Sequence, residues 1–215
     1  MGTITKSLNL LNFFSESVPE IGLIDFKKLT GQDKATIHRH LTELQENGFL
    51  EQNPENKKYR LGAAILRLAS VRETTFPTEI IVSQRVRSLS EELGELVHAS
   101  LISATDLSSL CFNDGGVGGT RVYFSEAEIL PLHATASGIA ALAFGQPHLL
   151  ENVGNSKPQK YTDATVTDTE AILGLVMDTR ERGFAITDQS FEPEVSSMAV
   201  PFFENNSFAY GTIAV

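Results

Sequence analysis

The chain has 215 residues, of which 41% are hydrophobic, and a formal net charge of −10 at pH 7. This length and composition suit one large folded domain or two modest ones, and they exclude a disordered chain. No apolar run reaches the roughly 18 residues of a membrane span and the amino terminus lacks a secretory signal profile, so we expect a cytoplasmic protein with no membrane partner.

Three predicted helices and a hairpin occupy the first 62 residues. Apolar residues at three- and four-residue spacing predict a helix over 4–14, and a short second helix covers 24–29. The third helix has Asp33 as its N-cap and ends at Asn47-Gly48, where glycine suits a C-terminal cap. Alternating residues on both sides of a turn at 53–56 predict two strands. This order of elements is a winged helix-turn-helix.

Strands interleaved with helices dominate the sequence after two further predicted helices. The first of these helices covers 62–71. The second has Val82, Val86, Leu89 and Leu93 on one face and ends at about Gly94. The Thr167–Glu170 stretch has the spacing of a capping box and opens a helix that ends before Gly183. The pattern predicts an α+β fold with domains at 1–62, 63–94 and 95–215. The other predicted elements are a helix over 137–144 and strands over 96–104, 107–113, 120–124, 184–187, 195–203 and 208–215.

The third helix carries two histidines, which raises the question of a metal site. His38 and His40 are about 200° apart around a regular helix, so they cannot hold one ion together. With Ile37, Leu41 and Leu44 turned inward, the opposite face is small, polar and cationic. Such a face is either simply solvated or suited to the major groove of DNA.

The outward cations of the first 62 residues favour the DNA-binding interpretation. This part holds eight basic and eight acidic residues, so the rest of the chain carries all of the negative charge. Arg39 can bind guanine or phosphate, Thr36 can reach a base or the backbone, and Lys34 lies in the first turn, where helix amides also meet phosphate. The predicted DNA-binding residues are Lys34, Ala35, Thr36, Arg39 and Thr42 on the helix and Lys57, Lys58 and Arg60 on the hairpin.

Several motifs in a fixed order resemble the IclR family of bacterial and archaeal transcriptional regulators. In the first part they are Ser7-Leu8, "LTGQDKATIHRHLTELQENGFLEQ" from Leu29 and "KYRLG" from Lys58. The later ones are "LPLHATASGIAALA" from Leu130, "RERGFAITDQSFEPEVSSMAVP" from Arg180 and the closing "YGTIAV". The resemblance covers nearly the whole chain.

The resemblance implies a GAF-like effector-binding domain, a homodimer or homotetramer, and double-stranded operator DNA whose binding depends on a small molecule. It places the effector against Ala136, Ser137, Thr187, Val195 and Ser197, with His133 nearby. The residues themselves offer hydroxyls and helix amides, so we expect a small carboxylate or a hydroxylated catabolite. The alternative is a GAF-like half that serves only oligomerisation. Relatives continue through a final helix, so either this chain lacks it or the sequence is cut short.

An enzyme is the competing functional class. His133, Asp188 and Cys111 could be imagined as a nucleophilic set, but no nucleophile-elbow or phosphate-loop sequence accompanies them. As the only cysteine, Cys111 excludes an intrachain disulfide and a cysteine-based zinc site, and its apolar neighbours predict a small buried side chain. We therefore predict no catalytic residue, no metal and no cofactor.

Overall fold

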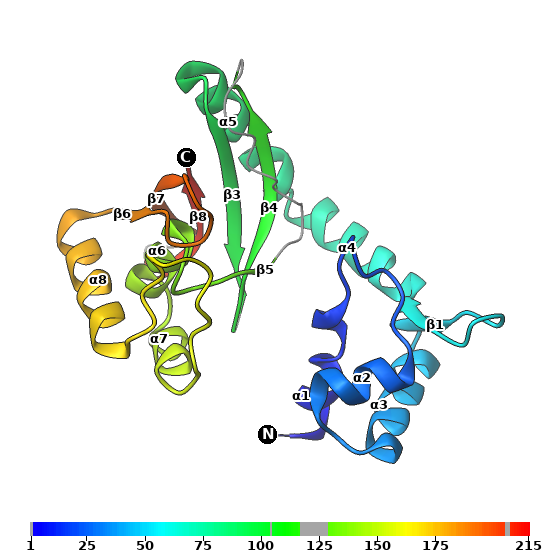
Figure 1. Cartoon of the computed structure of the whole chain (residues 1–215). Helices are drawn as coiled ribbons and strands as arrows, with labels where there is room; N and C mark the ends of the chain where they lie inside the picture. The colour runs from blue at the N-terminus through cyan, green and yellow to red at the C-terminus, as the bar shows by residue number, and fades with distance from the viewer. Residues whose placement is uncertain (1, 104, 117–128, 205–206) are drawn as a thin grey trace. The chain divides into compact units, whose positions relative to one another are not determined.

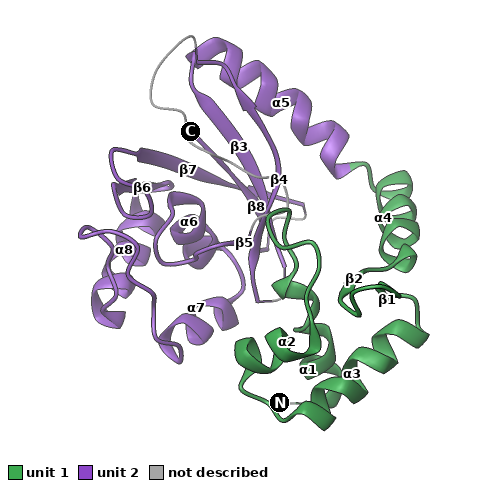
Figure 2. Cartoon of the chain, turned by 45° about the vertical axis from the view of Figure 1, so that its right-hand side comes forward, with its two compact units in different colours: residues 1–77 green, residues 78–215 purple. Residues whose placement is uncertain are grey.

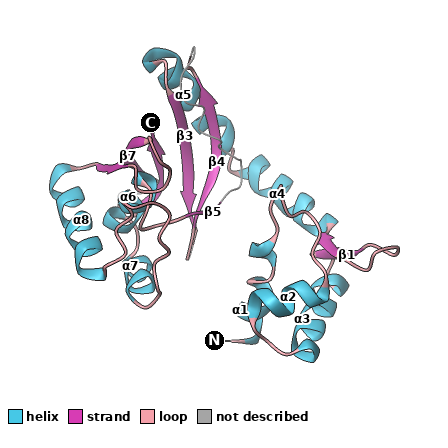
Figure 3. Ribbon diagram, in the orientation of Figure 1, coloured by secondary structure: helices cyan, strands magenta, loops and turns pink. Residues whose placement is uncertain are grey.

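A computed structural model describes residues 2–103, 105–116, 129–204 and 207–215. The chain divides into two compact units, residues 1–77 and 78–215 (Figure 2), and Figure 3 shows helices in both. Each unit has a hydrophobic core of its own. Nowhere in the described residues does a helix combine the length and the apolar content that crossing a bilayer requires.

The first unit is the predicted winged helix-turn-helix, followed by one further helix. The two strands pair antiparallel and form the wing. In chain order its elements (Figure 1) are α1 (Thr3–Leu8), the 3-10 turn η1 (Leu11–Phe13), α2 (Leu23–Thr30), α3 (Lys34–Glu46), β1 (Leu50–Gln52), β2 (Tyr59–Leu61) and α4 (Ala63–Thr75).

The first predicted helix is interrupted, which corrects the expectation of one helix over 4–14. α1 ends at Leu8, and the chain continues as the 3-10 turn η1. This course brings the rings of Phe13 and Phe14 edge-on to Phe26, with centroids 6.3 and 5.8 Å away. Aromatic contacts at such distances add to the gain from burial, so the core of the unit, and not the local period, decides where the first helix ends.

The turn and caps predicted around α3 are confirmed. Gly31 ends α2 with φ 68°, a left-handed conformation that glycine adopts without strain. A side-chain oxygen of Asp33 accepts a hydrogen bond from the backbone N–H of Thr36 at 3.0 Å, as an N-cap does. Ile37, Leu41 and Leu44 form the predicted inward stripe, and all three are buried.

His40 joins this buried face, which was not predicted from the sequence. Its side chain is 1% exposed, and neither ring nitrogen has a hydrogen-bond partner among the described residues. Desolvation, followed by the charges of Arg39 and Lys6, lowers the pKa of His40. A neutral imidazole therefore occupies a core position of α3 at neutral pH.

Among its described residues, the second unit forms a six-stranded antiparallel sheet with helices on both faces. The strand order is β5-β4-β3-β8-β7-β6. Its elements are α5 (Thr78–Leu93), β3 (Leu96–Ile102), β4 (Leu107–Asp114), β5 (Ile129–Leu130), α6 (Ala136–Phe144), α7 (Pro147–Gly154), α8 (Thr169–Arg182), β6 (Ala185–Asp188), β7 (Ser196–Phe203) and β8 (Ala209–Ala214).

Two clusters of buried residues define the layers of this unit. On one face α5 packs on β3 and β4, where Val86 meets Val97, Ala99 and Cys111. The burial of Cys111 confirms the prediction for that residue. On the other face α6 lies against β7 and β8 and is itself covered by α7 and α8 (Figure 1). Because α6 is enclosed on all sides, eight of its nine residues are buried.

Three details of the second unit differ from the sequence expectation. The short strand β5 and the helix α7 were not predicted, and β5 exists through its pairing with β4. Helix α8 begins one residue later than the predicted capping box, because Asp168 and not Thr167 accepts the hydrogen bond from the N–H of Ala171. The strand predicted over 120–124 lies outside the described residues.

Candidate functional site

The outward face of α3 carries the residues predicted to bind DNA. Lys34, Ala35 and Arg39 are exposed; Ala35 and Arg39 lie opposite the buried stripe, and Lys34 lies in the first turn of the helix. Two of the predicted hydroxyls are already engaged within the helix. Thr36 donates to the Asp33 carboxylate and so lowers the pKa of Asp33, and the Thr42 hydroxyl donates to the His38 carbonyl at 2.9 Å. Arg39 is thus the long cationic side chain at the centre of this face.

The wing brings three further predicted cations close together in sequence. Lys57 and Lys58 lie exposed in the turn between β1 and β2, and Lys57 has φ 58°. Arg60 on β2 is different, because its guanidinium forms an ion pair with Glu51 on β1, with Nη2 and Nε at 3.0 and 3.2 Å from Oε2. Lys57 and Lys58 therefore present their charge outward, whereas the charge of Arg60 is balanced within the wing.

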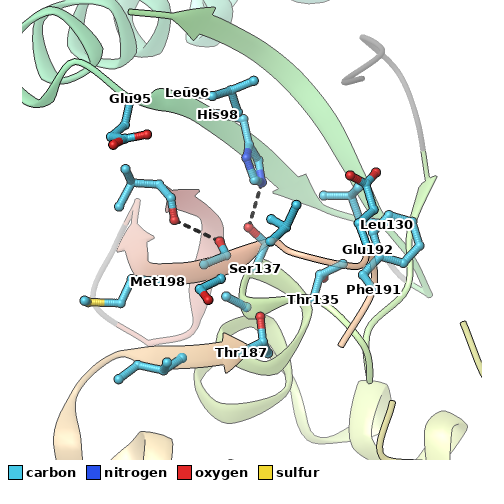
Figure 4. Close-up of a pocket in the computed structure, with 16 residues that line it drawn as sticks. Glu95, Leu96, His98, Leu130, Thr135, Ser137, Thr187, Phe191, Glu192 and Met198 are labelled. Atoms are coloured by element: carbon cyan, nitrogen blue, oxygen red, sulfur yellow. Dashed lines mark hydrogen bonds between the residues drawn. The ribbon is translucent and has the colours of Figure 1, made fainter. Parts of the chain in front are cut away.

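A cavity of about 450 Å³ opens in the second unit between the sheet and the start of α6 (Figure 4). Its walls are mostly apolar, with hydroxyl groups, one imidazole and two carboxylates among them. The lining residues are Glu95, Leu96, His98, Leu130, Thr135, Ala136, Ser137, Ile186, Thr187, Phe191, Glu192, Val195, Ser196, Ser197, Met198 and Val215. A volume of this size holds a small organic molecule.

His98 is the polar group on the strand side of this cavity. It projects from β3 toward α6, and its Nε2 lies 3.0 Å from the Oγ of Ser137 (Figure 4). Burial lowers the pKa of His98 to about 4, so the imidazole is neutral at pH 7. A neutral imidazole has one donor and one acceptor nitrogen and can therefore orient a ligand hydroxyl or carboxylate by hydrogen bonding.

Five of the six predicted effector residues line the cavity. Ala136 and Ser137 come from the start of α6, Thr187 from β6, and Val195 and Ser197 from the region where β7 begins. These segments are far apart in sequence, and the sheet brings them together.

His133, the sixth predicted effector residue, lies outside the cavity lining. Its Nε2 is 2.8 Å from the carbonyl oxygen of Gln159, and its ring lies 5.9 Å from that of Tyr161. These contacts attach the loop before α6 to the segment after α7. His133 therefore holds two loop segments together, and its side chain does not line the cavity.

The loop that precedes α6 approaches the helix very closely. Thr135 caps α6 by accepting the N–H of Gly138 at 2.9 Å, and its hydroxyl donates to the carbonyl of Pro131 at 2.9 Å. A Cβ on Gly138 would lie 2.5 Å from the carbonyl oxygens of both Pro131 and Leu132, so a side chain there would displace the loop. Glycine at this position therefore allows the loop at 131–132 to pack directly against the first turn of α6.

The residues of the imagined nucleophilic set have separate surroundings. Cys111 is buried beneath α5, His133 contacts Gln159 and Tyr161, and the Asp188 carboxylate accepts a hydrogen bond from Ser196. Among the residues that the structure describes, no group of three or more His, Cys, Asp or Glu side chains is placed to hold a metal ion.

Comparison with known proteins relates both units to one family. Residues 3–54 match the family described as "IclR helix-turn-helix domain", and residues 77–215 match "Bacterial transcriptional regulator IclR C-terminal". The HTH-type transcriptional regulator XynR of Escherichia coli is 28% identical over 95% of this chain and 81% of its own length.

Solved structures agree with this relation. A crystal structure of an IclR-type transcriptional regulator from Silicibacter sp. TM1040 is 40% identical, with a TM-score of 0.89 over all of this chain and 84% of that one. An IclR homologue from Microbacterium hydrocarbonoxydans, solved in complex with 4-hydroxybenzoate, shares the fold at 22% identity and a TM-score of 0.64, over all of this chain and 88% of its own. The protein therefore belongs to the IclR family of DNA-binding transcriptional regulators, whose C-terminal domain binds an effector.

Proposed function

We propose that this regulator binds a pseudo-palindromic operator through α3 and that a small organic acid or aromatic catabolite in the cavity changes its operator affinity. The observation that carries the first part is the exposure of Arg39 directly opposite the buried stripe of α3. A planar guanidinium in that position can donate two parallel hydrogen bonds to guanine in the major groove. Because it binds operator DNA, the protein acts in the cytoplasm.

The remaining predicted DNA contacts divide into two kinds. Lys34, Ala35, Thr36 and Thr42 surround Arg39 on the same helix and set how closely the helix approaches the bases. Lys57 and Lys58 in the wing bind backbone phosphates, which fix position and carry no sequence information. Arg60 joins them only when its ion pair with Glu51 opens.

Several features support ligand binding in the cavity. Apolar walls suit a hydrocarbon or aromatic skeleton, while His98 and the hydroxyls of Ser137 and Thr187 suit one polar group on that skeleton. The Thr135 cap takes the N–H of Gly138, and the preceding amides, those of Ala136 and Ser137, lie at the positive end of α6, which attracts an anion. The related protein that was solved with 4-hydroxybenzoate carries its ligand in the same fold.

Exposed side chains on α4 support a homodimer. This helix has no buried residue, and Leu66, Leu68 and Val71 are 75%, 41% and 53% exposed. Leu68 and Val71 share a face of the helix, with Leu66 about 200° from Leu68 around it, and exposed apolar side chains of this kind gain stability when a second copy covers them. A homodimer presents two copies of α3 to successive half-sites, and helices within 63–94 transmit the effect of the ligand.

The effector part of this proposal is tested by thermal shift with a panel of small carboxylates and aromatic acids that includes 4-hydroxybenzoate. Binding raises the free energy of unfolding by about 2.7 kcal/mol at a ligand concentration 100 times the Kd. Val195→Phe places a bulky ring in the wall of the cavity and should reduce the shift, while Val200→Phe, at an exposed position of β7, should keep it. A flat response of the unaltered protein across the panel would favour a C-terminal unit that serves only assembly.

A further inference from the structure

The wing is joined to the rest of its unit by a segment that precedes α2. Ile21 forms an isolated antiparallel bridge with Tyr59 on β2, with N···O distances of 2.9 and 2.8 Å. Both side chains are buried, Ile21 at 2% and Tyr59 at 3% exposed. The residue next to this bridge, Glu20, is half-buried and points its carboxylate at the turn of the wing.

Glu20 holds two side chains of that turn at once. Its Oε2 accepts a hydrogen bond from Asn56 Nδ2 at 2.8 Å, and its Oε1 accepts one from Asn53 Nδ2 at 3.3 Å. These bonds lower the pKa of Glu20, with a smaller contribution from the charges of Arg60 and Lys58. The carboxylate therefore stays ionised at neutral pH, and as an acceptor only it fixes which end of each amide faces it.

The other end of each amide shapes the turn. With Nδ2 on the carboxylate, Asn53 Oδ1 accepts the N–H of Glu55 at 2.9 Å, and Asn56 Oδ1 accepts the N–H of Lys58 at 2.8 Å. The backbone of Asn53 also accepts the N–H of Lys57 and donates to the carbonyl of Lys58. The path of the chain through both lysines is thus set by amides that Glu20 orients.

Lys57 needs this support more than its neighbours do. Its φ of 58° is a left-handed conformation, which is unfavourable for a residue with a Cβ and persists only where the surroundings impose it. A wing without the support would relax around Lys57 and spread the two lysine side chains over many directions. Contacts with phosphate depend on both lysines being held in place.

We propose that Glu20 is a positioning residue for DNA binding, because its carboxylate holds the wing turn in the conformation that presents Lys57 and Lys58 to backbone phosphates. The proposal rests on the proposed DNA contacts of the wing. In this proposal a negatively charged side chain strengthens binding to DNA, which is itself a polyanion. Electrostatics alone gives the opposite sign, since removing a negative charge near DNA strengthens binding.

That difference in sign provides the test. Glu20→Gln keeps the size of the side chain, but its amide cannot accept from both asparagines, and Glu20→Ala removes both bonds. Glu16→Gln is the matched control, because Glu16 is an exposed carboxylate in the same segment before α2. Affinity is measured on a duplex selected from a randomised pool by the unaltered protein, over a range of salt concentrations.

We expect both Glu20 variants to bind about tenfold more weakly, with a salt slope smaller by about 1 to 2 as phosphate contacts are lost. Circular dichroism should show an unchanged fold, and Glu16→Gln should bind equally well or better. Asn56→Ala should weaken binding in the same way and add little to Glu20→Ala, since both break one linkage. Glu20→Asp, which retains the charge on a shorter stem, should recover part of the affinity.

Two results would overturn the proposal. One is tighter binding by Glu20→Gln to the same extent as by Glu16→Gln, and the other is weaker binding with an unchanged salt slope. If Glu20→Ala unfolds, Glu20→Gln and Asn56→Ala decide by the same criteria. Failure of the unaltered protein to bind any duplex would instead reject the proposed DNA contacts as a whole.

Discussion

The α3 surface of the first unit and the cavity of the second place their key polar groups in opposite environments. Arg39 is exposed, charged, and positioned by the period of a single helix. His98 is enclosed and neutral, and it depends on a strand meeting a helix from another part of the chain. The exposed face of α3 can be predicted from residue spacing along the sequence. The cavity cannot, because it forms only when strands far apart in the sequence pair in the sheet.

The largest expected effect is the loss of stability at low pH that the enclosed imidazole of His98 causes. Because the pKa of His98 is about 4 when folded and near 6.5 when unfolded, the unfolded chain binds the extra proton as the pH falls through that window. The free energy of unfolding of the second unit should therefore fall by about 3 kcal/mol between pH 7 and pH 4 on account of this group.

Denaturant titrations from pH 4 to 7.5 measure this loss in the unaltered protein and in His98→Gln. The glutamine variant should lose less stability toward acid than the unaltered protein. Equal acid sensitivity of His98→Gln and the unaltered protein would show that the imidazole is not desolvated as described.

The next effect concerns the exposed guanidinium. Arg39→Ala should lower affinity for the selected duplex by about 1 to 3 kcal/mol, the value of one bidentate contact with a base. Folding should not change, because the side chain is exposed. Arg182→Ala removes the same charge from the exposed end of α8 in the second unit and serves as the control, measured by the same binding titration. An Arg39→Ala protein with full affinity would remove α3 from the interface.

A smaller effect is expected at the cap that begins α3. Asp33→Ala removes the side-chain acceptor for the N–H of Thr36 and should lower the melting temperature of the first unit by a few degrees. Thermal melting measures the loss, with Glu43→Ala as a control on an exposed position of the same helix. Unchanged melting in the Asp33 variant would mean that other groups satisfy the helix terminus.

The smallest effect is expected in the wing. Lys57→Ala should reduce the salt slope of DNA binding by about 0.9, the contribution of one phosphate contact, and should weaken binding about equally on all sequences. Lys157→Ala removes an exposed cation from the second unit and is the matched control. A change in sequence preference in the Lys57 variant would indicate that the wing reads bases.

Much of the fold could be predicted from the sequence, because its signals are local. The stripe of Ile37, Leu41 and Leu44, the Asp33 cap and the alternation of the later strands each need only a short window. The break after Leu8 could not be predicted, because it depends on the ring of Phe26. The strand β5, with two residues, has no pattern of its own and forms by pairing with β4.

The candidate site was predictable to different extents in the two units. The spacing of apolar residues in α3 predicted its exposed face. It did not predict that His40 lies on the buried face, although His40 is three residues after Ile37 and four before Leu44. In β3, alternation separates His98 from Val97, but only the packing of α5 and α6 decides which of them meets the cavity. A helix after Gln146 had a local signal, a proline at its first position, which could have revealed α7.

The enclosure of α6 limits how the ligand preference of this regulator can evolve. Nearly every residue of that helix is buried, and Gly138 has no room for a Cβ, so substitutions on this wall of the cavity would disturb the core before they altered recognition. Phe191, Glu192 and residues 195–198 reach the cavity from a loop and the start of a strand, where side chains are more exposed and changes cost less. New specificities in descendants of this protein should therefore arise by mutation on the β6–β7 side, while the helical wall stays as it is.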